Sequence, residues 1–410
     1  MNIHLSNTIS RMFCLSLCIA LMMGCNAKGL MNLQSGNLLG SQEWLGEPLS
    51  FTVPFDWHDG HIIIELEVNN QQNLRFALDS GASATVLFET QRTKALKLSV
   101  GMQLDLQGSD VNIVNDASIA IGKIKLSEMT IIQVPIEQSP LFGSFDEAYF
   151  DGAIGYDLLN RYVTLINYAD KTVTFFKDSP AIIQDGDWVK LPMSVIGRIP
   201  HVAASLYNKG EVETTYNFTI DTGAPDYLYI NSSLAANLSF PSSYFETKTR
   251  NFTGEHIVQT SRFDVFKIAE FNFNNIAIHN LPYFKDENGI GLIGSGLLRN
   301  FDIVFDYENE YIAFKKNRLF SYDTFIDRSG LRIEPHTGGA LVKEVVKDTH
   351  AQTLNILAGD VVTKINNKTL NDNNFDELRA LLSSDMNEVE LCWVSNEQEK
   401  CEVLFLRDMI

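Results

Sequence analysis

The stretch that decides the fold is FALDSGA, residues 76–82, which returns 142 positions later as FTIDTGA, residues 218–224. A second, longer match follows each copy. Residues 151–176 (DGAIGYDLLNRYVTLINYADKTVTFF) align without a gap with residues 290–315 (IGLIGSGLLRNFDIVFDYENEYIAFK), at an offset of 139. Two markers that keep nearly the same separation indicate a duplicated unit of roughly 130 residues.

Polar breaks and a change of pattern set the boundaries around this duplication. We expect a first repeat at residues 48–180 and a second repeat at residues 186–318. Short runs rich in Val, Ile, Phe and Thr, broken by Gly, Asn, Asp and Pro, are typical of strands. Residues 326–410 differ, because their strand-like runs alternate with helix-like stretches such as NFDELRALL. The sequence therefore predicts a mainly β protein that ends in a mixed β/α domain.

The composition of the chain limits the kinds of binding partner that we expect. The chain has 410 residues, of which 45% are hydrophobic, so it can bury several cores. Its net charge of −19 argues against a nucleic-acid partner. The pair His58 and His61 flanks Asp-Gly, which is a hairpin-turn signal rather than a metal motif. No His-Glu-x-x-His occurs, so we expect neither a metal nor a cofactor.

The N-terminus has the pattern of an export signal. The apolar run from Met12 to Met23 is too short to span a bilayer of about 30 Å. It ends in Met22-Met23-Gly24-Cys25, which resembles the lipobox of bacterial lipoproteins. This resemblance implies a signal peptide at residues 1–24, lipidation at Cys25 and a lipid anchor in the membrane. A plain signal peptide with an incidental cysteine is the alternative.

Two consequences follow for the first mature residues. Residue 26 is Asn rather than the Asp that retains such lipoproteins at the inner membrane, so the resemblance implies an outer-membrane protein of the bacterial envelope. Residues 25–47, with many Gly, Asn, Gln and Ser, are expected to be the anchor and a flexible linker.

Two cysteines remain in the mature chain, Cys392 and Cys401. Their numbers sum to 793, and so do those of Asn396 and Glu397 at the centre of the turn between two strand-like runs. We therefore expect the cysteines to lie opposite each other in a hairpin, within bridging distance. An exported protein permits a disulfide there, and two unpaired thiols are the equal alternative.

Each repeat places an aspartate after an apolar strand and before a glycine. Gly81 and Gly223 permit a tight backbone path at these two loops. If the repeats pack about a pseudo-twofold axis, Asp79 and Asp221 meet and share one proton. The charged carboxylate can then take a proton from water while the protonated one polarises a carbonyl. This arrangement hydrolyses an amide without a metal or a covalent intermediate.

The neighbouring hydroxyl residues, Ser80 and Thr222, are expected to form hydrogen bonds locally and brace their own loops.

The two aspartate motifs resemble the catalytic loops of retropepsin-like aspartic proteases. Ala153-Ile154-Gly155 and Leu292-Ile293-Gly294 resemble that family's second signature, two hydrophobic residues and a glycine behind the loop. The resemblance covers about residues 48–318 and implies two tandem closed β lobes with one cleft, as in pepsin. It implies an aspartic endopeptidase that cleaves extended segments of peptide or protein substrates, with Asp79 and Asp221 catalytic.

The same resemblance bears on covering hairpins and assembly. Residues 107–109 and 253–255 are candidates for hairpins that cover the cleft. We expect a monomer with an internal pseudo-dimer, although pairing of each lobe with its copy in a second molecule is an alternative.

The C-terminal residues resemble a bacterial PDZ domain. Gly330-Leu331-Arg332-Ile333 matches the loop that binds a peptide carboxylate, and residues 358–366 (AGDVVTKIN) match the family's most recognisable stretch. The resemblance implies capture of protein C-termini, for recruitment of substrates or partners. A catalytically inactive envelope adaptor, in which this domain binds protein tails, is the alternative function.

Overall fold

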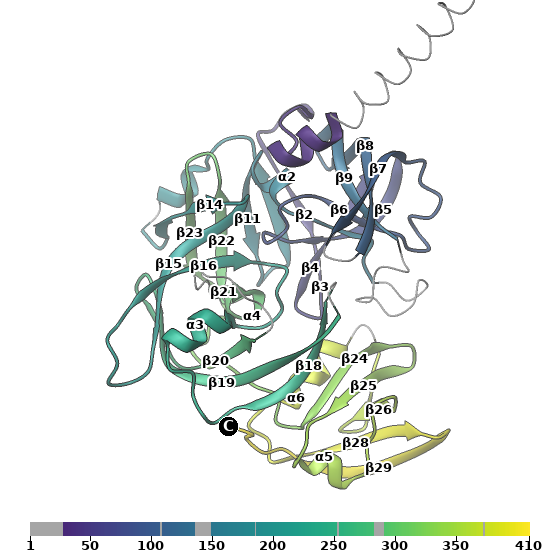
Figure 1. The fold of residues 1–410 in the computed structure, drawn as a ribbon, viewed down its shortest axis with the longest axis vertical. Coiled ribbons are helices and arrows are strands. Elements are labelled where there is room, and N and C mark those ends of the chain that lie inside the picture. The colour runs from purple at the N-terminus through teal and green to yellow at the C-terminus, as the bar shows by residue number, and fades with distance from the viewer. Residues whose placement is uncertain are drawn as a thin grey trace, which may run out of the picture.

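A computed structural model describes residues 28–106, 109–135, 149–184, 186–251, 254–282, 291–371 and 374–410. The protein is mainly β, as the strand-like texture predicts. Figure 1 shows two β bodies, formed by the first repeat (residues 48–180) and the second repeat (residues 186–318), and a smaller body formed by the C-terminal region (residues 326–410).

The first repeat forms a closed barrel with the strand order β4-β5-β10-β6-β9-β8, because β8 also pairs with β4. Strand β3 extends the barrel as a hairpin with β4, and β7 as a hairpin with β8. The strands are β3 (Asp56–His58), β4 (His61–Val68), β5 (Gln71–Leu78), β6 (Val86–Phe88), β7 (Ser99–Leu106), β8 (Ser109–Ile121), β9 (Ile124–Val134) and β10 (Gly152–Ile154).

The second repeat forms a second closed barrel with the equivalent order β15-β16-β21-β17-β20-β19, which closes where β19 pairs with β15. This element-by-element match is what a duplicated unit predicts. The strands are β14 (Ser194–Ile196), β15 (Ile199–Tyr207), β16 (Thr215–Asp221), β17 (Leu228–Asn231), β18 (Phe245–Asn251), β19 (Gly254–Ile268), β20 (Phe271–Leu281) and β21 (Gly291–Gly294). Short helices accompany the barrels: α2 (Tyr156–Leu159), η3 (Ala181–Gln184), α3 (Ser232–Asn237) and α4 (Ser295–Leu298).

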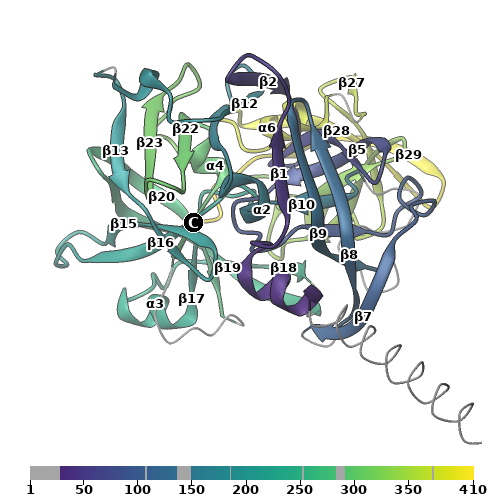
Figure 2. The same cartoon turned by 90° about the horizontal axis from the view of Figure 1, so that it is seen from above.

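A six-stranded sheet joins the two repeats, with the order β13-β23-β22-β11-β12-β2. At its centre Leu165 pairs with Val304, and 304 − 165 equals the repeat offset of 139. A residue that pairs with its own equivalent marks the pseudo-twofold axis between the repeats. The strands are β2 (Ser50–Pro54), β11 (Val163–Asn167), β12 (Thr172–Phe176), β13 (Val189–Pro192), β22 (Phe301–Asp306) and β23 (Tyr311–Lys316). Figure 2 shows the two repeats side by side across this sheet.

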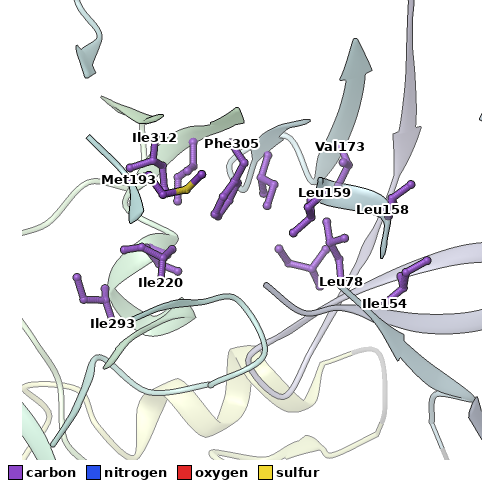
Figure 3. Close-up of a cluster of buried hydrophobic side chains, with 14 of the residues drawn as sticks. Leu78, Ile154, Leu158, Leu159, Val173, Met193, Ile220, Ile293, Phe305 and Ile312 are labelled. Carbon is purple, nitrogen blue, oxygen red and sulfur yellow. The ribbon is translucent and has the colours of Figure 1, made fainter. Parts of the chain in front are cut away.

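One continuous hydrophobic cluster lies inside both barrels and under the joining sheet. Figure 3 shows that equivalent residues of the two repeats, such as Leu78 and Ile220, or Ile154 and Ile293, contribute to it. Leu78 and Ile220 directly precede the two aspartates, so the core fixes both aspartate loops from below.

The prediction of a flexible linker is wrong for residues 28–47. Residues 28–35 are helical, and β1 (Ser41–Trp44) pairs with β9 at the edge of the first barrel. The buried Asn37 exchanges two hydrogen bonds with the main chain of Thr130, at 3.0 and 2.7 Å. The polar side chains that suggest a linker here satisfy buried backbone groups. The predicted signal peptide and Cys25 lie outside the described residues.

The C-terminal region has its own sheet, β24-β25-β26-β28-β29, with β27 beside β26, and its own hydrophobic cluster. Its elements are β24 (Leu331–His336), β25 (Gly339–Val345), α5 (His350–Thr353), β26 (Val361–Ile365), β27 (Lys368–Thr369), α6 (Phe375–Leu381), β28 (Glu388–Ser395) and β29 (Gln398–Phe405). In Figure 1 this region lies next to β18 and below the β3 end of the first barrel. Within the described parts of the chain, no helix has the length and apolar character needed to cross a membrane.

The hairpin of β28 and β29 has the register that the turn-centre arithmetic predicts, with Cys392 opposite Cys401. Their sulfur atoms are joined in a disulfide, so the two unpaired thiols that the sequence left as an alternative are not found.

Candidate active site

Parallel strand pairs bring each aspartate loop onto the second motif of its repeat. Strand β5 pairs with β10, and β16 pairs with β21. The Asp79 amide donates to the Ile154 carbonyl at 2.9 Å. A Cβ on Gly155 would lie 1.9 Å from the Asp79 carbonyl oxygen, and one on Gly294 would lie 2.3 Å from the carbonyl oxygen of Asp226. Only glycine fits at these contacts, and this explains why each second motif ends in one.

The two aspartate carboxylates meet at the junction of the repeats. A Cβ on Gly81 would lie 2.6 Å from Asp221 Oδ2, and a Cβ on Gly223 would lie 2.6 Å from Asp79 Oδ1. Each carboxylate therefore lies over the glycine of the opposite loop, and the two are hydrogen-bonded to each other. Each also accepts a 2.8 Å hydrogen bond from the amide of its own loop glycine.

The hydroxyl residues brace the opposite loop rather than their own. Ser80 Oγ donates to the Ile220 carbonyl at 2.7 Å and accepts from the Thr222 amide at 3.0 Å. Thr222 Oγ1 donates to the Leu78 carbonyl at 2.6 Å and accepts from the Ser80 amide at 2.9 Å. The predicted local brace is thus corrected to four buried hydrogen bonds that cross between the repeats.

Electrostatics favour one proton shared by the pair. Burial raises the pKa of both carboxyl groups, and the negative charge of Asp221 raises the pKa of Asp79 further. The amides of Gly81 and Gly223 oppose these shifts by stabilising the ionised forms. Both aspartates nevertheless keep part of their surface exposed, so a ligand or water can reach the shared proton.

A hairpin of the first repeat lies against the loop that carries Asp221. The residues between β3 and β4 form the predicted two-residue turn, with positive φ at Asp59 and Gly60. A Cβ on Gly60 would lie 2.4 Å from the Cβ of Pro225, so the turn contacts this loop directly. The charge of His61 lowers the pKa of Asp221 against the larger effect of burial. In the described residues, no group of three or more metal-type side chains gathers here or elsewhere.

A cavity of about 910 Å³ adjoins this site and reaches the C-terminal region. Its described lining includes Leu331, Arg332 and Ile333, three of the four residues predicted to bind a peptide carboxylate. The fourth, Gly330, directly precedes β24 and has a φ of +74°. The lining also includes Asp226, which lies five residues after Asp221, but neither aspartate of the pair. The structure therefore places the two predicted sites next to each other rather than in one cluster.

One group of residues at this junction has no signal in the sequence. Arg379 of α6 forms an ion pair with Asp59, across a separation of 320 residues, and a second one with Asp376 at 3.2 Å. No local pattern indicates such a contact. The sequence around Asp59 predicts only a turn, and the sequence around Arg379 predicts only an exposed position on a helix.

The candidate covering hairpins are β7 with β8 and β18 with β19. Their tips, residues 107–108 and 252–253, lie outside the described residues, so a covering role remains a prediction.

Comparison with known proteins assigns no family. No family model matches the chain, and no curated protein shows a significant match to it.

Proposed function

We propose that the protein is an aspartic endopeptidase of the retropepsin-like class, with the two repeats as its lobes. The observation that carries the proposal is the pair of Asp79 and Asp221, one from each repeat, which is positioned by crossed hydrogen bonds and biased toward one shared proton. Two carboxylates in this arrangement are suited to acid and base catalysis on a single water molecule.

The chemistry follows from the shared proton. The ionised carboxylate takes a proton from a water molecule as the water oxygen bonds to the carbonyl carbon of a peptide. The protonated carboxyl donates to the carbonyl oxygen, which becomes a hydroxyl in the tetrahedral intermediate. The first carboxyl then gives the proton taken from water to the amide nitrogen, while the second carboxylate takes a proton back from a hydroxyl of the intermediate. The carbon–nitrogen bond breaks, a carboxylic acid and an amine leave, and the shared proton is restored. An extended substrate backbone suits this site, because strand-like segments expose their carbonyl groups singly.

The C-terminal region is proposed to be a PDZ-like module that holds polypeptide segments for cleavage or partner recruitment. The support is the cavity lined by Leu331, Arg332 and Ile333 beside the aspartate loops. With lipidation at Cys25, the enzyme would act in the bacterial envelope, at the outer membrane.

The decisive experiment is digestion of an unfolded polypeptide mixture by the purified full chain, with products identified by mass spectrometry. Asp79→Asn and Asp221→Asn should each lower turnover by roughly 10²–10⁴-fold. Asp170→Asn, an exposed acid that pairs with Arg318, is the matched control and should retain turnover. Turnover that survives both active-site substitutions would refute the proposal.

A second candidate function is an inactive adaptor that binds protein tails, and the cavity beside residues 331–333 favours it. Binding of C-terminal peptides without any cleavage by the wild-type chain would select this function.

A further inference from the structure

The C-terminal region contacts the candidate active site through the ion pair of Arg379 with Asp59. The Arg379 and Asp59 side chains are 36% and 33% exposed, so their pair is partly shielded from water. Burial raises the pKa of Asp59, but the charge and hydrogen bond of Arg379, together with the charges of His61 and His58, outweigh burial, so the pKa is lowered. The pair is therefore a favourable contact and holds the turn of β3 and β4 against α6.

The same turn is clamped onto the loop of Asp221. The Gly60 carbonyl accepts a hydrogen bond from Ser295 Oγ, and this hydroxyl also donates to the Ala224 carbonyl at 3.0 Å. The Ser295 amide donates to the same carbonyl at 2.7 Å. Ala224 directly follows Gly223, and the carboxylate of Asp79 packs against Gly223. A continuous set of contacts thus runs from α6 through the turn to the aspartate pair.

We propose that Arg379 is a positioning residue for the aspartate pair, supplied by the C-terminal region. It fixes Asp59, and the turn that Asp59 begins fixes the loop of Asp221. The expected effect on kcat rests on the proposed peptidase function. The expected effect on the position of the Asp221 loop rests on the contacts alone. When Arg379 is lost, Asp59 turns toward water and the turn no longer presses on Pro225, so the two carboxylates lose their alignment.

The kinetic test compares Arg379→Gln, Asp59→Asn and their combination with wild type, in the full chain. We expect kcat to fall about tenfold to a hundredfold in each single variant, with KM changed much less. The double variant should be no slower than Arg379→Gln alone, because Asp59→Asn removes an ion pair that Arg379→Gln has already removed. Arg379→Lys keeps the charge and should recover part of kcat.

The matched control is Glu377→Gln, on the same helix. Glu377 pairs with Lys368 on the outer surface, at 71% and 62% exposure, and does not line the cavity. Glu377→Gln should therefore leave kcat unchanged. A kcat within twofold of wild type in Arg379→Gln, or multiplicative losses in the double variant, would overturn the inference.

A second measurement needs no turnover. Hydrogen exchange at the amides of Gly223 and Ala224 should become about tenfold faster in Arg379→Gln and Asp59→Asn, but not in Glu377→Gln. Unchanged exchange overturns the positioning role. A wild-type chain without turnover but with the expected exchange pattern would refute the proposed function and leave the positioning role supported.

Discussion

At the scale of single residues, Ser80 and Thr222 tie the two repeats together at the aspartate pair. Each hydroxyl donates to one main-chain carbonyl and accepts from one amide of the opposite loop. Because both side chains are buried, a lost hydroxyl leaves two backbone groups without partners and without water.

Thr222→Val removes the hydroxyl and keeps the shape of the side chain. We expect the free energy of unfolding to fall by about 2–4 kcal/mol, because an amide and a carbonyl remain buried and unpaired. Thr222→Ser keeps both hydrogen bonds and should lose about 1 kcal/mol or less, for the missing methyl group. Urea denaturation of the two variants measures the difference, and equal losses would argue against the crossed bonds.

The aspartate pair should make stability depend on pH in a specific direction. The folded protein raises the pKa of both carboxyl groups above their unfolded values, so it binds protons more tightly than the unfolded chain. Their stabilising contribution is therefore complete at low pH and is lost as pH rises through the folded pKa values. Asp79→Asn cannot ionise and escapes this loss.

We expect Asp79→Asn to match wild type in stability near pH 4 and to exceed it near pH 8, because only the wild-type carboxyl ionises between these pH values. Thermal unfolding across this pH range checks the crossing of the two curves. Parallel curves would show that folding does not raise the pKa of Asp79.

At the scale of elements, the turn before β24 contains a carboxylate of its own. Asp327 Oδ1 accepts hydrogen bonds from Ser329 Oγ and from the amides of Ser329 and Gly330, at 2.6 to 2.9 Å. Burial nevertheless raises the pKa of Asp327 to about 6. The folded protein thus prefers the neutral acid, and the stability of this turn decreases as pH rises from about 4 to about 6.

Asp327→Asn should keep the acceptor oxygen without the charge. We expect this variant to be more stable than wild type at pH 7.5 and equal to it at pH 4, whereas Asp327→Ala should be less stable at both. Melting temperatures at the two pH values decide this. An Asn variant that is destabilised equally at both would mean that the negative charge itself holds the turn.

Elements set by local pattern follow the sequence predictions closely. The hairpin of β28 and β29 and the turn at Asp59 depend on turn position and alternation, and both form as predicted. Residues 28–47 do not, because their Asn and Ser side chains look the same in a linker as in a buried hydrogen-bond network. The sequence does not predict the Asp59–Arg379 contact either, because the two residues meet only through the packing of separate regions.

At the scale of the whole molecule, the duplication predicts most of the architecture. The offset between the repeats in the sequence corresponds to a pseudo-twofold axis in the structure, which passes between Leu165 and Val304. The symmetry about this axis brings the two aspartates together. No pattern in the sequence predicts the orientation of the C-terminal region relative to the barrels. This orientation depends on a few polar contacts, such as the bond from the Lys248 amide to Glu344 at 2.7 Å.

The hydrophobic clusters predict how the molecule unfolds. One cluster spans both repeats, so the two barrels should unfold as a single cooperative unit, while the separate cluster of the C-terminal region should give its own transition. Trp393 is buried in the latter and reports on it by fluorescence. Reduction of the Cys392–Cys401 disulfide should lower only the transition seen by Trp393, by about 2 kcal/mol, and leave that of the barrels unchanged. Coincident shifts in both transitions would instead show that the contacts between α6 and the β3–β4 turn couple the C-terminal region to the barrels throughout unfolding.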